Sequence, residues 1–267
     1  MQTKILKYLF NKSALLCLLV VLIAGCNKVV TTNTTTGTNN NNNNNNNPLN
    51  NDTLTDFPRI KFYTVMDYGN TKVKVVLNSS TPVTIAKYYP SSQYLIANKG
   101  SNYITVYYPD TSATSTVLSM QEDLISGCYY SCFIYRVGYE WKLSLVKDDV
   151  SAPSIASNAK IRVLDFRTQA YFNYVNVRIY NTAIDEKNYY NRNFLDHETY
   201  SSNALFKEIT AGSLYHVRIY NDSTILKQRD SVTFTAGKIY SIVLMTPSTL
   251  SPSAALTQIW PDVNQLN

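Results

Sequence analysis

The chain has 267 residues, of which 45% are apolar and 16% charged, and it holds 22 tyrosines but only eight glycines and two histidines. Tyrosine favours strands, whereas long helices need more Ala, Leu, Glu and Lys. So few histidines and glycines disfavour most metal centres and phosphate-cradling loops. The formal charge of +6 falls to +3 without the three lysines of residues 1–25. This excess is spread out and forms no basic stripe, so nucleic acid is not an expected partner.

The N-terminus has the pattern of a secretory signal. Three lysines precede an apolar stretch at 14–23, which is too short to span a bilayer because spanning takes roughly 20 helical residues. Residues 23–26, Ile-Ala-Gly-Cys, look like the lipobox of bacterial lipoproteins. We therefore expect a signal peptide over 1–25 and lipid attachment at Cys26, which would anchor the mature chain in a membrane.

Residues 26–57 are rich in Thr and Asn and include nine consecutive asparagines at 39–47. Nothing in this segment can be buried to offset the entropy of ordering, so we predict a disordered tether. Asn27 stands where inner-membrane lipoproteins of enteric bacteria carry an aspartate, which favours the outer membrane as the location. The sequence does not decide between the periplasmic and the external leaflet of the outer membrane.

From residue 58 onward, short segments alternate between apolar and polar residues. Lys72–Leu77 and Val175–Tyr180 are two examples, and Asn, Ser, Pro or Gly interrupts such segments every eight to twelve positions. A period of two with regular turns predicts strands, and no segment shows the period of an amphipathic helix. We therefore predict an all-β chain of immunoglobulin-like or transthyretin-like sandwiches.

Three segments recur in the same order, which indicates an internal repeat. They are 59–62 with 160–163, 100–103 with 212–215, and 127–131 with 237–241. The predicted sandwiches cover 58–149 and 158–248, and a C-terminal tail covers 249–267. The changing offset places a loop that is about eleven residues longer in the second copy, near 189–205. The joint contains Pro153 and no glycine, so we expect a semi-rigid connection with the sandwiches packed end to end.

These motifs resemble a known family. The chain is similar to the tandem β-sandwich lipoproteins of unknown function common in Bacteroidota. The motifs that carry this resemblance are Lys160-Ile161-Arg162-Val163, the Gly-x-x-Tyr segment at 100–103, the Gly-x-x-Tyr-Ser segment at 237–241 and the joint at 147–153. The resemblance covers roughly 58–248. The family's Ser-Pro-Asp-Ala-Pro loop is absent, and the family has no established activity to transfer.

The sequence offers few groups for catalysis. Asp196, His197 and Glu198 are adjacent in the longer loop and could ligate a metal or form a hydrolase site, but such a triplet without further partners is more typical of a solvated turn. The motifs of serine hydrolases, zinc proteases and nucleotide-binding loops are missing. We therefore expect a chain that is not an enzyme and that needs no cofactor or metal.

Two cysteines, Cys128 and Cys132, remain after signal cleavage and lipidation. Within one strand their Cα atoms would be roughly 13 Å apart, whereas a disulfide needs less than about 7 Å. We expect both thiols to be buried on one face of a strand and not bonded to each other.

Paired tyrosines are the candidate ligand-binding residues. Tyr88 with Tyr89, and Tyr189 with Tyr190, occupy equivalent places in the two repeats. Exposed rings could stack on sugars or form a protein interface, whereas the alternative is that one ring of each pair packs in the core.

The sequence as a whole predicts a non-catalytic cell-envelope lipoprotein. Its two sandwiches would serve binding or adhesion, or would form an accessory subunit of an envelope complex. Its expected partners are the membrane, through the lipid anchor, and a surface glycan or an envelope protein. A glycan-binding lipoprotein that uses the paired tyrosines and a hydrolase with a site near Asp196, His197 and Glu198 are the alternatives, and the ligand and oligomeric state stay open.

Overall fold

The computed structural model describes residues 56–65, 72–86, 93–109, 116–167, 174–181 and 186–245, and the backbone of 256–260. The predicted signal peptide, Cys26 and most of the tether lie outside these ranges, as do Tyr88 and Tyr89. The described part is almost entirely β, which confirms the predicted fold class; its helical segments are α2 (Asp196–Thr199) and η2 (Ser201–Ala204). Among the described residues, no helix has the length and apolar character needed to cross a membrane.

The first sandwich consists of two four-stranded sheets. Sheet A has the order β4-β1-β7-β8 and sheet B the order β3-β2-β5-β6. Their strands are β1 (Arg59–Thr64), β2 (Val73–Leu77), β3 (Val83–Ile85), β4 (Leu95–Ile96), β5 (Gly100–Tyr107), β6 (Thr116–Leu124), β7 (Tyr129–Val137) and β8 (Glu140–Asp148).

The second sandwich repeats this arrangement. Sheet C has the order β12-β9-β15-β16 and sheet D the order β11-β10-β13-β14. Their strands are β9 (Asn158–Phe166), β10 (Val175–Tyr180), β11 (Glu186–Arg192), β12 (Lys207–Thr210), β13 (Leu214–Asn221), β14 (Thr224–Thr233), β15 (Ile239–Met245) and β16 (Leu256–Trp260).

The two sandwiches have the same topology, strand for strand. The parallel pair β1–β7 places Arg59 opposite Tyr129, and the parallel pair β9–β15 places Lys160 opposite Ile239. The segments matched in the sequence therefore occupy equivalent strands. Strand β16 pairs with β15 as β8 pairs with β7. Residues 249–267, set apart above as a tail, thus include the eighth strand of the second sandwich.

Backbone conformation explains the repeated glycines. Gly100 and Gly212 have φ of 80° and 81°, and Gly127 and Gly237 have φ of 70° and 75°. Only glycine adopts this region without steric cost. Each matched pair therefore marks the same turn in the two sandwiches.

Each sandwich encloses its own apolar core, built by strict alternation. In β10, for example, Val175, Val177 and Ile179 are buried in the core between sheets C and D, whereas the intervening side chains face outward. Sheets A and B enclose the equivalent core of the first sandwich. Successive side chains of a strand point to opposite faces, so each sheet also has a second face that points away from this core.

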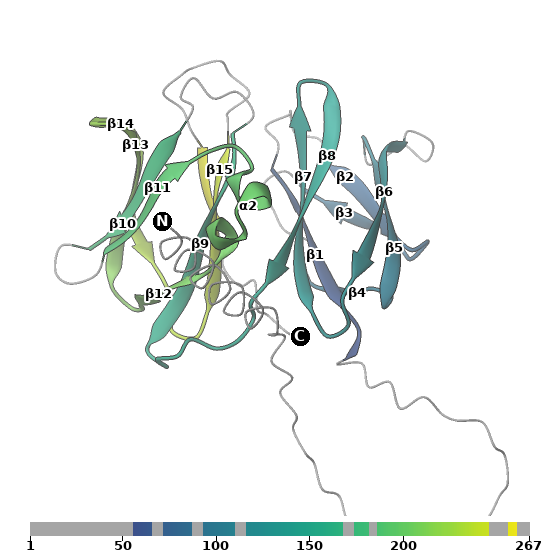
Figure 1. The fold of residues 1–267 in the computed structure, drawn as a ribbon, viewed down its shortest axis with the longest axis horizontal. Coiled ribbons are helices and arrows are strands. Elements are labelled where there is room, and N and C mark those ends of the chain that lie inside the picture. The colour runs from purple at the N-terminus through teal and green to yellow at the C-terminus, as the bar shows by residue number, and fades with distance from the viewer. Residues whose placement is uncertain are drawn as a thin grey trace, which may run out of the picture. The chain divides into compact units, whose positions relative to one another are not determined.

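Sheets A and C use their second faces to pack against each other. Tyr63, Phe133 and Tyr135 of sheet A form one buried cluster with Phe166 and Val243 of sheet C. The ring centroids of Phe133 and Phe166 are 4.9 Å apart. The expected end-to-end packing is therefore wrong, because the sandwiches pack face to face. The layers follow in the order B, A, C, D (Figure 1).

A buried polar network crosses the layer between sheets A and C. Arg162 of β9 donates from Nη2 to Asp148 Oδ1 at 2.7 Å and from Nε to Ser241 Oγ at 2.8 Å. Asp148 also accepts hydrogen bonds from Ser131 and Tyr94. The side chains of Arg162 and Asp148 are both fully buried. A buried ion pair tolerates little change, because removal of one partner leaves the other charge without compensation.

The longer loop of the second copy also belongs to this layer. Phe194, Leu195 and Ala204 pack against the A–C cluster, and the ring of Phe206 lies 4.5 Å from the guanidinium carbon of Arg162. The insertion therefore contributes to the packing between the sandwiches and does not extend freely into solvent.

Cys132 is a free, buried thiol, so it is not bonded to Cys128, as predicted. Both cysteines belong to the core of the first sandwich. Burial raises the pKa of the Cys132 thiol, which therefore stays protonated at neutral pH.

Candidate functional site

The structure separates the tyrosines of the second predicted pair. Tyr189 is buried in the core, where its hydroxyl donates to the carbonyl oxygen of Ile161 at 3.1 Å, and burial raises its pKa. Tyr190 is 64% exposed. Tyr189 therefore offers no ring to a ligand, because its place in the alternation points it inward. The role proposed for Tyr88 and Tyr89 stays a prediction.

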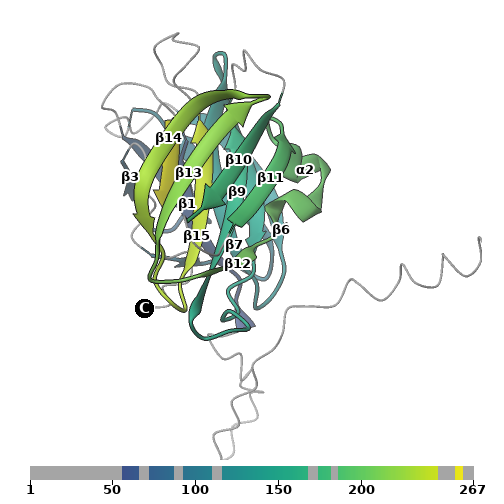
Figure 2. The same ribbon diagram turned by 90° about the vertical axis from the view of Figure 1, so that its left-hand side faces the viewer.

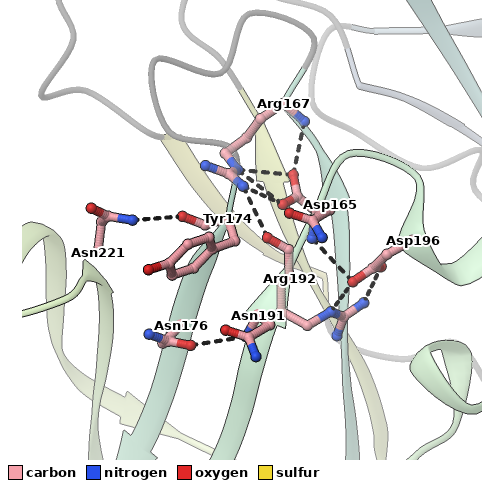
Figure 3. Close-up of polar contacts among 9 residues, drawn as sticks. Asp165, Arg167, Tyr174, Asn176, Asn191, Arg192, Asp196 and Asn221 are labelled. Carbon is pink, nitrogen blue, oxygen red and sulfur yellow. Dashed lines mark hydrogen bonds and ion pairs between the residues drawn. The ribbon is translucent and has the colours of Figure 1, made fainter.

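Asp196 belongs to a buried pair of salt bridges (Figure 3). Arg192 donates from Nε and Nη2 to the two carboxylate oxygens of Asp196 at 2.6 and 2.7 Å. Next to it, Arg167 and Asp165 form a second bidentate pair, and Arg167 Nη2 donates to the carbonyl oxygen of Arg192 at 3.2 Å. These four side chains hold the loop insertion against β9 and β11.

His197 and Glu198 have different surroundings from Asp196. His197 is buried, with its Nε2 3.0 Å from Ser144 Oγ of β8, and burial lowers its pKa to about 4. Glu198 is exposed. The three side chains do not converge on a common site, so the geometry does not support the hydrolase alternative. Within the described ranges, no group of three or more His, Cys, Asp or Glu residues is placed to hold a metal ion.

Strands β14, β13, β10 and β11 of sheet D lie toward the viewer in Figure 2, and the outer face of this sheet carries an unusual set of side chains. On this face β10, β11 and β13 present aromatic and cationic groups that are at least partly exposed. We call this set the tyrosine–arginine face: Arg178, Tyr180, Tyr190, His216, Arg218 and Tyr220.

An internal repeat that the sequence analysis missed creates this face. The pentapeptide Val-Arg-Ile-Tyr-Asn occurs at 177–181 and again at 217–221. The two copies run antiparallel in neighbouring strands with Arg178 opposite Arg218, so a local two-fold axis passes between the arginines. Tyr180 and Tyr220 therefore lie toward opposite ends of the face, about 14 Å apart for four residues along a strand.

Two arginines directly opposite each other in an antiparallel pair repel, which costs stability. Four contacts offset this cost. Arg178 Nη2 donates to Glu186 Oε2 at 2.7 Å, and Arg218 Nε donates to Gln228 Oε1 at 2.6 Å. Both guanidinium carbons also lie over the Tyr180 ring, at 4.5 and 5.0 Å from its centroid. The arginines are thus held in place while their side chains stay at the surface.

Further hydrogen bonds extend from each arginine. Glu186 accepts a bond from Asn188 at 2.6 Å, and its pKa is lowered by the hydrogen bond from Arg178. Gln228 donates to Asp230 at 2.6 Å, and Asp230 also contacts His216, whose hydrogen bond lowers the pKa of that carboxylate. Arg178 is therefore paired with an ionised carboxylate, and Arg218 is connected to one through Gln228.

Comparisons with known proteins find only distant likenesses. No family model matches the chain, and no curated protein matches its sequence. A streptococcal virulence factor whose structure concerns alpha-glucan binding has 8% identity and a TM-score of 0.25, over 77% of this chain and 97% of its own. A candidate cell adhesion protein from Bacteroides ovatus has 8% identity and a TM-score of 0.20, over 77% and 96%. Another from Bacteroides uniformis has 7% identity and a TM-score of 0.21, over 78% and 98%.

At this level of similarity the function has to be derived from the side chains of the chain itself. Fold and face define an all-β protein of two face-to-face sandwiches, one of which bears an ordered aromatic and cationic surface.

Proposed function

We propose that the chain is a non-catalytic cell-envelope lipoprotein that binds a partner through the tyrosine–arginine face. Tyr and Arg are, with Trp, the residue types enriched at binding hot spots, because each offers a large contact area together with hydrogen-bonding groups. Membership of the tandem β-sandwich lipoproteins of Bacteroidota is part of this proposal. It is supported by the family-like motifs, which lie on equivalent strands of the two sandwiches.

The anchor and tether support the location. Lipidation of Cys26 would fix the chain to a membrane, and a flexible segment of about thirty residues has a root-mean-square length of roughly 30 Å. The described sandwiches could then search for partners near the membrane surface.

The observation that carries the binding role is the arginine pair at the centre of an exposed sheet. Arg178 and Arg218 face each other across two strands, where a polar uncharged pair would avoid their repulsion. Residues that break a local stability rule and are compensated nearby are expected at functional sites.

The anchor is tested in cells that express the full chain. Labelling with a palmitate analogue should mark the wild type and not the Cys26→Ala variant. An unlabelled wild type would contradict the lipoprotein assignment.

The binding role is tested with the detergent-solubilised full chain on arrays of surface glycans and envelope proteins. The double variant Arg178→Gln/Arg218→Gln should lose array binding. The control Lys74→Gln, a lysine next to Tyr107 on the outer face of sheet B, should retain it. Absence of binding on both arrays, or binding that the double variant retains, would contradict the proposal.

A further inference from the structure

We infer that the ligand of the tyrosine–arginine face is an uncharged polysaccharide chain that lies along β10 and β13. This inference rests on the proposed function, since it names the ligand class of the same face. It involves residues other than the paired tyrosines considered from the sequence, apart from Tyr190.

The first argument is the charge balance of the face. Arg178 is paired with Glu186, and Arg218 is linked through Gln228 to Asp230. Two positive and two negative side chains leave no net charge to attract an acidic or a basic ligand. A polyol fits such a surface, because each hydroxyl both donates and accepts hydrogen bonds and can contact a guanidinium and a carboxylate alike.

The second argument is the position of the aromatic rings. Asn176 lies opposite Tyr220 and accepts a hydrogen bond from the backbone N–H of Asn191, the neighbour of Tyr190, so Tyr220 and Tyr190 lie at the same end of the face. Tyr180 lies toward the other end, with its ring centroid 5.2 Å from that of His216. Apolar faces of sugar rings can pack on such aromatic side chains. The separation of about 14 Å between the two ends suits an extended chain of sugars and exceeds the span of a single ring.

The third argument is that the polar groups are ordered before a ligand arrives. Asn188, Glu186 and Arg178 form one hydrogen-bonded series, and Arg218, Gln228 and Asp230 form another. Ordered side chains lose little conformational entropy on binding. This matters for a hydrophilic ligand, which buries little apolar surface to offset such a loss.

A protein partner fits the centre of this face less well. Between Asn176 and Tyr180 on β10, and between His216 and Tyr220 on β13, every outward side chain is polar or aromatic. Ile225 and Leu214 are exposed, but they lie at the margins, opposite Tyr220 and Thr233 respectively. The core of a protein interface favours Tyr and Arg but is depleted in carboxylates, whereas Glu186 and Asp230 accompany the arginines here.

The test uses the detergent-solubilised full chain on an array of neutral, acidic and amino polysaccharides, with an envelope-protein array beside it. We expect neutral polysaccharides to bind, with little change between about 50 mM and about 500 mM salt. Tyr190→Ala and Tyr220→Ala should each weaken binding about tenfold, which corresponds to about 1.4 kcal/mol and lies within the range of one aromatic contact. The control Tyr103→Ala, a tyrosine of sheet B that is 57% exposed, should bind like the wild type.

Three results would overturn the inference. They are binding confined to acidic polysaccharides and lost at high salt, binding to neutral polysaccharides that both tyrosine variants retain, and absence of polysaccharide binding. If envelope proteins bind instead, and the Arg178→Gln/Arg218→Gln variant abolishes that binding, the glycan inference fails while the proposed function stands.

Discussion

The layer between sheets A and C and the outer face of sheet D both place arginines against aromatic rings, yet they treat the charge differently. Arg162 is fully buried and bonded to Asp148, with the ring of Phe206 beside it. Arg178 is 41% exposed and is bonded to an equally accessible Glu186. In the first region the charge is enclosed with its counterion, and in the second it stays at the surface.

The difference predicts which property of the protein, stability or binding, each region controls. A buried ion pair affects folding strongly when one partner is lost, whereas an exposed pair contributes about 0–1 kcal/mol. Substitutions in the A–C layer should therefore change stability. Substitutions in the tyrosine–arginine face should change binding and leave stability nearly unaltered.

The largest effect is expected for Asp148→Asn. It leaves the buried Arg162 without its counterion and also weakens the hydrogen bonds from Ser131 and Tyr94. The free energy of unfolding should fall by about 3–5 kcal/mol in denaturant titrations. The control Glu140→Gln removes an exposed pair with Lys142 and should leave the free energy of unfolding nearly unchanged. Equal effects of the two changes would contradict the comparison.

The second prediction concerns pH and the A–C layer. Burial holds the pKa of His197 at about 4, below its ordinary 6.5, so the unfolded chain takes up a proton that the folded chain does not. The free energy of unfolding should therefore fall as pH decreases from about 6.5 to about 4, by about 3 kcal/mol from this residue.

Unfolding of the wild type and of His197→Gln, each measured at pH 7 and at pH 4.5, tests this point. The wild type should lose more stability on acidification than the variant. If His197→Gln and the wild type show the same pH dependence of unfolding, the conclusion that His197 is buried in its neutral form is wrong.

A smaller effect is expected at the turns shared by the two sandwiches. Gly212→Ala introduces a side chain at φ 81°, and an added Cβ meets no atom within 4 Å, so the cost is conformational. The free energy of unfolding should fall by about 1 kcal/mol. Gly100→Ala, at φ 80° in the first sandwich, should behave alike. Unequal costs in thermal melts would show that the two turns are not equivalent.

The smallest stability effect is expected for Arg218→Thr. The change removes the hydrogen bond to Gln228 but also relieves repulsion from Arg178, so stability should stay within about 0.5 kcal/mol of the wild type. Array binding should nevertheless be lost. If the variant is clearly destabilised, Arg218 stabilises the fold and the prediction is wrong. If the variant still binds, Arg218 is not part of the binding site.

The sequence predicted the sandwiches because alternation and glycine spacing are local signals. Gly100 and Gly212 mark equivalent turns, and the recurring segments lie on equivalent strands. The face-to-face packing had a local signal as well, namely the almost unbroken apolar strand β15, which is buried on both faces.

The candidate site was harder to predict from the sequence. Tyr189 and Tyr190 are neighbours in the chain but point to opposite faces of β11, and only the strand's register decides which of them is exposed. Asp196 and His197 are likewise hydrogen-bonded to Arg192 and Ser144, respectively, and no local sequence pattern predicts these contacts. The repeated Val-Arg-Ile-Tyr-Asn was visible, but its meaning depends on the antiparallel register that brings Arg178 opposite Arg218.

Residue-resolved chemical footprinting with and without a bound neutral polysaccharide tests the central claim most directly. The account predicts that bound polysaccharide protects Tyr190 and Tyr220, while Tyr103 and the 89% exposed Tyr139 react as in the free protein. Protection of Tyr103 or Tyr139 with no change at Tyr190 and Tyr220 would place the ligand elsewhere and contradict the account.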